Sequence, residues 1–206
     1  MQIKEEYHQE TIIRKSRFLC ILRPVHSEEE ARSFIHEVQK EYHDASHVCT
    51  AWVMGENNQL QRSNDNGEPA GTAGVPMLEA LKKSGIQDVC ACVVRWFGGI
   101  KLGAGGLIRA YGGITADALA SASKVKEVPV DVYEVRYPYA MQGTLESWLR
   151  QQGTIKDTMY DEEITVLVET ENKTFPEKVK DLSRGTVIPK YLRTMTVLKE
   201  MEDKDQ

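Results

Sequence analysis

The chain has few cysteines and no long apolar run, and both absences narrow the classes of protein it can belong to. Only four cysteines occur among 206 residues, at positions 20, 49, 90 and 92, and none forms the paired C-x-x-C motifs of a zinc ribbon. Their apolar, strand-like surroundings indicate buried thiols in a reducing compartment. No stretch approaches the ~20 apolar residues that span a bilayer. We therefore expect neither a zinc site nor any association with a membrane.

The chain also lacks a net positive charge. Its 26 lysines and arginines face 31 aspartates and glutamates, which gives a formal net charge of −5. Proteins that bind nucleic acid by bulk attraction are usually basic, so any such binding has to be local here. The first twenty residues are rich in charge and hold no apolar core of a signal peptide. We expect a cytoplasmic protein.

Several catalytic and nucleotide-binding motifs are missing as well. No glycine is followed by the Lys-Ser or Lys-Thr of a Walker A loop. A G-x-G-x-x-G fingerprint beginning at Gly103 fails because Ile108 stands at its last position. The G-x-S-x-G and H-E-x-x-H motifs of hydrolases are also absent. We expect no cofactor, and evidence for an enzyme is thin.

What the chain does contain is a dense cluster of glycines with cations. Residues 93–113, VVRWFGGIKLGAGGLIRAYGG, hold seven glycines, and no acid occurs between Asp88 and Asp117. Glycine is costly to order, so the cluster serves either close packing of backbone or the binding of an anion. A strand, a glycine loop and a helix N-terminus in succession favour the anion. The candidate contacts are Arg95, Trp96, Gly98, Gly99, Lys101, Gly103, Gly105, Gly106 and Arg109.

A second loop, SNDNGEPAGTAGVP at residues 63–76, is the other half of the candidate site. Asp65 and Glu68 have neither the number nor the spacing of EF-hand ligands, and Asx turns explain the composition without a metal. A loose magnesium site or a general-base pair is the weaker alternative. We favour a loop that Asp65 and Glu68 order, with Glu68 paired to an arginine opposite. Thr72 is expected to cap the helix that follows.

Two further residues are assigned to the same cleft. His47 lies in HDASHVC, where no set of four metal ligands is evident, so it is either a packed histidine or a general base. Arg17 lies in IIRKSRF beside Arg14 and Lys15. These three cations either extend the positive face of the glycine loop or protect a strand edge.

The periodicity of apolar residues indicates two domains. In residues 1–131, strands are expected in the stretches RFLCILRPV, SHVCTAWVM, QLQRS and IQDVCACVVRWF, and helices at 27–42, 75–85 and 106–124. The pattern changes near Asp131. Residues 132–206 then show strand, helix, strand, strand, helix and strand, which is the βαββαβ order of ferredoxin-like domains.

The motifs RKSRF, ASHVCTAW, NDNGEPAGTAGVP and the glycine-rich stretch, in this order, resemble the IMPACT family in its bacterial YigZ/YvyE form. The resemblance implies an α+β protein. Its first domain would be of the ribosomal protein S-five second-domain type, with helices on one face of a sheet. Its second, ferredoxin-like domain would be similar to the last domain of elongation factor G. The family pattern has a second acid where Asn66 stands, which argues further against a metal.

The resemblance also implies a role in translation. Eukaryotic relatives restrain a kinase-activation pathway that slows translation during amino-acid starvation, a stress response, by competing for a protein partner. They lack the C-terminal domain, so that partner does not transfer.

We therefore favour a translation-linked regulatory factor that binds RNA or the ribosome. Arg95, Lys101 and Arg109 would contact phosphates, and an aromatic residue, Trp96 or Phe97, would stack on a base. One alternative is an enzyme acting on a small phosphorylated or nucleotide ligand in the same cleft. The other is a protein-interaction module without RNA binding.

Overall fold

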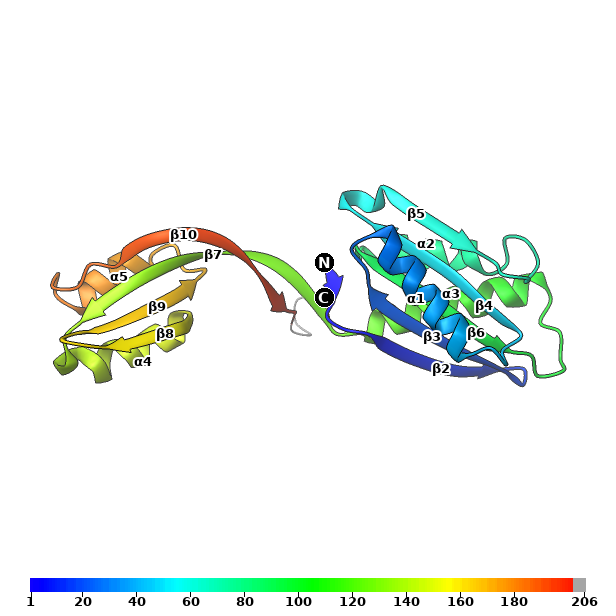
Figure 1. The fold of residues 1–206 in the computed structure, drawn as a ribbon, viewed down its shortest axis with the longest axis horizontal. Helices are drawn as coiled ribbons and strands as arrows, with labels where there is room; N and C mark the ends of the chain where they lie inside the picture. Colours follow the sequence, from blue (N-terminus) through cyan, green and yellow to red (C-terminus); the bar gives the residue numbers. More distant parts are fainter. Residues whose placement is uncertain (202–206) are drawn as a thin grey trace. The chain divides into compact units, whose positions relative to one another are not determined.

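The structure is a computed structural model that describes residues 1–201, and it is an α+β protein with two five-stranded sheets (Figure 1). The chain divides into two compact units. The first comprises residues 1–126 together with Glu200 and Met201, and the second comprises residues 127–199. The expected boundary at Asp131 lies inside strand β7 (Lys124–Tyr137), which contributes residues to both units. Among the described residues, no helix combines the length and apolar character needed to cross a membrane.

The sheet of the first unit is antiparallel and has the strand order β2–β3–β6–β4–β5. Its strands are β2 (Tyr7–Ile13), β3 (Ser16–Pro24), β6 (Val89–Trp96), β4 (His47–Met54) and β5 (Leu60–Asn64). A short strand β1 (Gln2–Ile3) pairs instead with the beginning of β7. A 3-10 turn, η1 (Glu56–Asn58), connects β4 and β5. The four strands expected from the apolar pattern are all present, and β2 is an addition.

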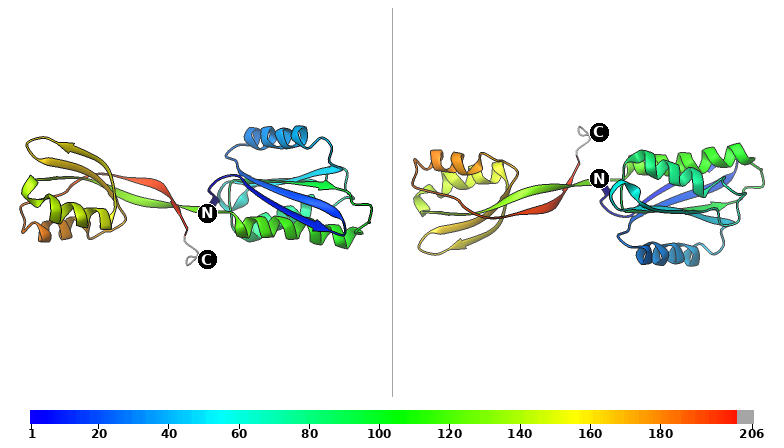
Figure 2. Two further views of the ribbon diagram at one scale, coloured as in Figure 1. Left: turned by 90° about the horizontal axis from the view of Figure 1, so that it is seen from below. Right: turned by 90° about the horizontal axis from the view of Figure 1, so that it is seen from above.

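Helices cover both faces of this sheet, whereas the family resemblance led us to expect them on one face. Helix α1 (Glu28–Glu41) lies on one side, and α2 (Gly74–Ser84) and α3 (Ala104–Ser121) lie on the other (Figure 2). The sequence of β6 accounts for the difference, because it is apolar at almost every position. Alternate side chains of a strand point to opposite faces, so β6 supplies Val93 to the core under α2 and α3 and Val94 to the core under α1.

The helix ends of the first unit follow the expected capping chemistry in part. The Ser27 hydroxyl accepts a hydrogen bond from the Glu30 backbone N–H at 3.1 Å and so caps α1. Gly85 ends α2 in the left-handed conformation. Strand β2 was not predicted from the sequence, because its hairpin turn to β3 is built from Arg14 and Lys15, with φ of 44° and 66°. Asparagine and glycine are the usual residues of such turns.

The second unit is ferredoxin-like, as predicted. Its strands are β7, β8 (Thr154–Tyr160), β9 (Ile164–Thr170) and β10 (Lys190–Glu200), and its helices are α4 (Gln142–Gln152) and α5 (Phe175–Leu182), with a 3-10 turn η2 (Tyr139–Met141) before α4. The spatial order β10–β7–β9–β8 places the first and third strands side by side, as a split βαβ unit requires. Both helices lie on one face of the sheet (Figure 2). Their core includes Val135, Leu149, Val166 and Phe175.

Candidate functional site

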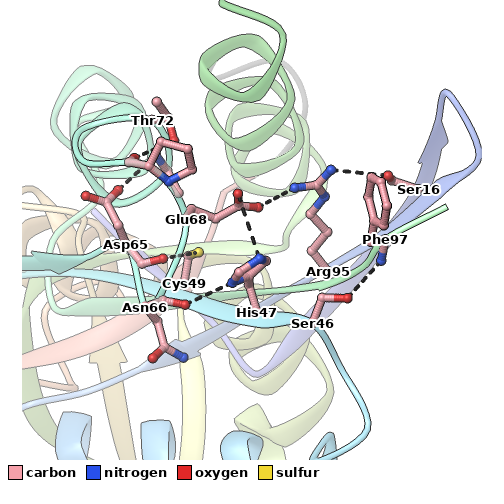
Figure 3. A network of polar contacts seen from close by, with 12 residues as sticks. Ser16, Ser46, His47, Cys49, Asp65, Asn66, Glu68, Thr72, Arg95 and Phe97 are labelled. Atoms are coloured by element: carbon pink, nitrogen blue, oxygen red, sulfur yellow. Dashed lines mark hydrogen bonds and ion pairs between the residues drawn. The ribbon is translucent and has the colours of Figure 1, made fainter. Parts of the chain in front are cut away.

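A buried ion pair between Glu68 and Arg95 organises the candidate site (Figure 3). Glu68 belongs to the loop between β5 and α2, and Arg95 lies near the end of β6. Arg95 Nη1 donates to Glu68 Oε1 at 2.5 Å, and the two side chains are only 6% and 3% exposed. The Tyr111 hydroxyl of α3 donates to the same carboxylate oxygen at 2.7 Å. Loop, sheet and helix are thus joined at one carboxylate.

The phenol of Tyr111 is held in its protonated form. Burial raises its pKa well above the usual value, and the neighbouring Cys49 and Glu68 raise it further. A neutral phenol is the donor that the Glu68 carboxylate needs. Tyr111 is spaced along α3 like the buried apolar residues Leu107 and Ile114. Helical spacing alone therefore does not indicate its polar role.

Arg95 is committed to this network and has almost no surface left for a ligand. Its Nη2 lies 3.4 Å from Ser16 Oγ, and its guanidinium lies 5.4 Å from the ring centre of Phe18 and 5.6 Å from that of Phe97. The whole residue is 5% exposed. The structure therefore pairs Glu68 with an arginine, as expected, but it places that arginine beneath the surface. Arg95 supports the site and does not reach a phosphate.

His47 joins the network from β4. It lies opposite Arg95 in the sheet register, so both side chains point to the same face. Its Nε2 is 3.9 Å from Glu68 Oε2, and its Nδ1 is 3.1 Å from the backbone oxygen of Asn66. Gly67 passes so close that a Cβ there would lie 3.2 Å from His47 Nδ1. His47 therefore packs against the loop that carries Glu68.

Asp65, and not Thr72, caps helix α2. Asp65 Oδ1 accepts hydrogen bonds from the backbone N–H groups of Ala73 and Gly74 at 3.0 and 2.8 Å. The Thr72 hydroxyl turns back and donates to the Pro69 carbonyl at 2.6 Å. The expectation for Thr72 is wrong because the helix begins two residues later, and a carboxylate nine positions before Gly74 already occupies its N-terminus.

The same carboxylate orders the rest of the loop. Asp65 Oδ2 accepts from the Gly71 backbone N–H at 2.8 Å. Partial burial raises the pKa of Asp65, but the three backbone N–H groups outweigh that effect and hold the pKa below its usual value. The Cys49 thiol donates to the Asp65 carbonyl at 2.9 Å, and burial raises the pKa of this thiol to about 12. Cys49 is thus a neutral packing group.

The glycines of the loop have different structural reasons. A Cβ on Gly98 would lie 1.9 Å from the Lys15 carbonyl oxygen, so this glycine permits close packing against the β2–β3 turn. Gly106 is similarly restricted, at 2.9 Å from Leu102 Cβ. Gly99 and Gly103 have φ of 82° and 74°, which other residues rarely adopt. Gly105 faces open space except for Arg109. Close packing therefore explains Gly98 and Gly106, whereas the first turn of α3 at Gly105 is not covered by other backbone.

The N-terminus of α3 carries free cations. The helix begins at Ala104 without a side-chain cap at Gly103, so its first backbone N–H groups are available to an anion. Lys101 and Arg109 are exposed, and neither forms an ion pair with any residue of the described chain. The position of a Gly105 Cβ would be 3.6 Å from Arg109 Nη1, so Arg109 lies along this first turn.

The hairpin turn of β2 and β3 adds two more exposed cations to this region. Arg14 and Lys15 form the turn, and the close approach of Lys15 to Gly98 brings it against the glycine loop. Phe97, 49% exposed, precedes Gly98, and its backbone N–H donates to Ser46 Oγ at 3.0 Å. We call Arg14, Lys15, Lys101, Arg109 and the N-terminal turn of α3 the basic loop surface.

Trp96 and Arg17 lie outside this surface. Trp96 Nε1 donates to Asp44 at 2.9 Å, and its ring packs edge-on against Tyr42 in the core below α1. Arg17 lies 4.3 Å over the same ring and pairs with Glu10 at 2.9 Å. Adjacent residues of a strand point to opposite faces, so Trp96 could not share a site with Arg95. That conclusion was available from the sequence once β6 was recognised.

Comparisons with known proteins assign the family. The Impact N-terminal domain model matches residues 14–119, and a domain of unknown function, DUF1949, matches residues 135–186. The chain belongs to the IMPACT family. It is 44% identical to the family member YvyE of Bacillus subtilis, over 89% of this chain and 86% of that protein. It is 38% identical to YigZ of Escherichia coli, over 85% of this chain and 89% of that protein. The resemblance to the bacterial form is confirmed.

Two further matches show how much of this chain resembles other relatives. The solved structure of a hypothetical protein, 35% identical, aligns with a TM-score of 0.58 over 93% of this chain and 96% of its own. The Protein IMPACT homolog of Schizosaccharomyces pombe is 34% identical, but over only 44% of this chain and 33% of its own length. The eukaryotic likeness is therefore partial, and the bacterial likeness extends over nearly the whole chain.

Proposed function

We propose that this protein is a cytoplasmic, translation-linked regulatory factor that binds RNA, on the ribosome or free, through the basic loop surface. One observation carries the proposal. Two exposed cations, Lys101 and Arg109, lie at an uncapped helix N-terminus in a stretch without acids, and the turn that carries two more, Arg14 and Lys15, packs against that stretch at Gly98, on a protein whose net charge is −5. Such a local concentration of positive charge is what a phosphate backbone recognises.

Each part of the surface has a distinct task in this proposal. Lys101 and Arg109 contact phosphates at the start of α3, where the helix dipole and free N–H groups also favour negative charge. Arg14 and Lys15 extend the contact along the backbone of the RNA. Phe97, the exposed aromatic residue beside the loop, stacks on a base.

The buried network holds these groups in place. Glu68 links the β5–α2 loop, Arg95 and Tyr111, and Tyr111 lies on the helix that carries Arg109. Arg95 is thereby a positioning residue. Its guanidinium lies near the Phe97 ring, so the ion pair supports the aromatic side of the surface as well.

The connection to translation rests on the family. The eukaryotic relatives implied by the sequence resemblance act in translational control, and the S. pombe homologue matches part of this chain. RNA or the ribosome is the partner that suits both this context and a basic surface. A protein partner alone would not require the acid-free stretch.

Co-sedimentation with purified ribosomes tests the proposal. Wild type should pellet with ribosomes at low salt and release as salt rises, whereas Lys101→Ala/Arg109→Ala should stay in the supernatant. Arg32→Ala/Lys40→Ala removes the same charge from α1, on the other face of the sheet, and should pellet like wild type. Equal behaviour of all three proteins, or no binding by wild type, would refute the proposal. A thermal-stability panel of nucleotides and phosphates would then test the small-ligand alternative.

A further inference from the structure

A groove of about 900 Å³ runs between α2 and α3 on the first unit. Besides the buried Ile86 and Leu119, its lining contains small side chains that recur at every fourth position of both helices. They are Pro76, Ala80 and Ser84 on α2, and Gly112, Ala116 and Ala120 on α3. A Cβ at Gly112 would lie 3.5 Å from Pro76 Cβ, so the helices touch at this point. Residues four apart lie on the same face of a helix, and small residues on such a face let the backbone of another helix approach closely.

The two ends of the groove differ in character. Val75 and Ile108 flank the end nearer the helix N-termini, and they are 50% and 44% exposed. Exposed aliphatic side chains around a groove mark an interaction surface more often than isolated ones do. The other end, near the C-termini of both helices, has Lys83 and Lys124 in its lining.

The charges at this second end are incompletely balanced. Glu79, the one acid that the described residues contribute to the lining, is paired with Lys82 at 3.3 Å. The Lys124 ammonium donates to the Ala120 carbonyl at 2.9 Å. Lys83 forms no ion pair with any residue between 1 and 201. A partner that fills the groove would therefore bring a carboxylate to this end.

We propose that the groove binds one amphipathic α-helix of a partner protein, lying antiparallel to α2 and α3 with an acidic residue in its first turn. An antiparallel helix places its N-terminal turn beside Lys83, where its dipole also favours an acid. The stretch from Val75 to Ser84 is ~14 Å long at the rise of an α-helix. Two to three turns of a partner helix, with apolar residues at i, i+3, i+4 and i+7, match that length.

The open walls favour a helix over other occupants. Val75 and Ile108 are about half exposed, so the groove does not enclose a ligand on all sides. An aliphatic chain would remain partly in water, whereas an amphipathic helix presents its polar face there. The surface is distinct from the basic loop surface, which lies at the start of α3, so the two can be tested separately.

Selection from a displayed library of randomised 16-residue helical peptides on the full-length protein tests the proposal. We expect enriched peptides with the stated apolar spacing and an acid in the first turn. A selected peptide should bind Ala116→Arg at least tenfold more weakly than wild type, by fluorescence anisotropy. Gly113→Arg adds the same charge three residues earlier on α3, outside the groove lining. This variant should bind the selected peptide like wild type. Ala116 is exposed, so its variant is expected to fold, which a thermal melt checks.

The role of Lys83 is tested by charge exchange. Lys83→Glu should weaken binding of the selected peptide. Exchange of the peptide's first-turn acid for lysine should restore binding to this variant. The absence of enriched peptides, or binding that ignores Ala116→Arg, would overturn the proposal. So would stabilisation by dodecanoate that Ala116→Arg removes, which would make the groove a lipid site. A dimer in light scattering that Ala116→Arg dissociates would equally overturn it, because a second copy would then be the occupant.

Discussion

Glu68 Oε1 accepts hydrogen bonds from both Arg95 Nη1 and the Tyr111 hydroxyl, so one buried carboxylate connects the β5–α2 loop to β6 and α3. Both charged partners are almost completely shielded from bulk water, since their side chains are 3% and 6% exposed. A buried pair of this kind adds little net stability. Removal of one member alone is nevertheless strongly destabilising, because the other charge is then left buried and unpaired. This pair also holds the loop that contains Asp65 and Glu68 against the end of β6, where the glycine loop begins.

Removal of one partner should therefore be costly. Glu68→Leu leaves the Arg95 guanidinium buried without a counter-charge, and we expect a loss of about 3–5 kcal/mol in the free energy of unfolding. Urea denaturation monitored by circular dichroism measures this loss. The double variant Glu68→Leu/Arg95→Met should recover most of it, because the uncompensated charge is gone. A Glu68→Leu protein as stable as wild type would contradict the buried pair.

The cap formed by Asp65 makes a second stability prediction. Asp65→Ala removes the acceptor for three backbone N–H groups and should cost about 1 kcal/mol at neutral pH. The folded-state pKa of Asp65 lies below its unfolded value, so its contribution is present above the unfolded pKa and is lost as pH falls through the folded pKa. The difference in stability between wild type and variant should consequently shrink in acid. Thr72→Val, which leaves the cap intact, should show no such pH dependence. A difference that grows in acid would contradict the cap.

The glycines of residues 98–113 should respond differently to the same substitution. Gly98→Ala places a Cβ within 1.9 Å of the Lys15 carbonyl oxygen, and the backbone there cannot yield cheaply. We expect a clear loss of stability and a shift of the β2–β3 turn. Gly113→Ala meets nothing within 4 Å in the middle of α3, so it should gain ~1 kcal/mol from helix propensity. Thermal melts of the two variants check both signs, and equal effects would contradict the assignment.

Substitutions of the two aromatic residues that follow Arg95 should have different effects on RNA affinity. Phe97→Ala removes an exposed ring and should weaken binding by ~1–3 kcal/mol if the ring stacks on one base. Trp96→Phe loses the hydrogen bond to Asp44 but lies on the face toward α1, so RNA affinity should hold. Filter binding with a single-stranded oligonucleotide measures both. A larger effect at Trp96 than at Phe97 would contradict the placement of the surface.

Much of the fold follows from local patterns in the sequence. The apolar run VCACVVRW predicts a buried strand, and the βαββαβ rhythm after residue 131 predicts the ferredoxin-like order that the sheet has. Strand β2 was not predictable in this way, because its turn uses Arg14 and Lys15 in place of the usual asparagine and glycine. Its partial burial also produces no strong apolar signal.

The candidate site was predictable in composition but not in arrangement. The acid-free stretch points to Lys101 and Arg109 directly, and strand alternation would have separated Arg95 from Trp96. Burial of Arg95 could not be inferred, because it depends on the long-range contact with Glu68 and on Tyr111 from a third element. The cap of α2 was assigned to the nearest hydroxyl, whereas the loop folds back so that Asp65 reaches it first.

The salt dependence of ribosome affinity tests the central claim most directly. Wild type should lose affinity linearly in a plot of log K against log salt concentration, at ~0.7–0.9 per phosphate contact. Lys101→Ala/Arg109→Ala should bind more weakly and show a slope smaller by ~1.5, the share of two contacts. Arg32→Ala/Lys40→Ala should keep the wild-type slope. A slope near zero for wild type, or an unchanged slope in the Lys101 and Arg109 variant, would contradict the assignment of the basic loop surface to RNA.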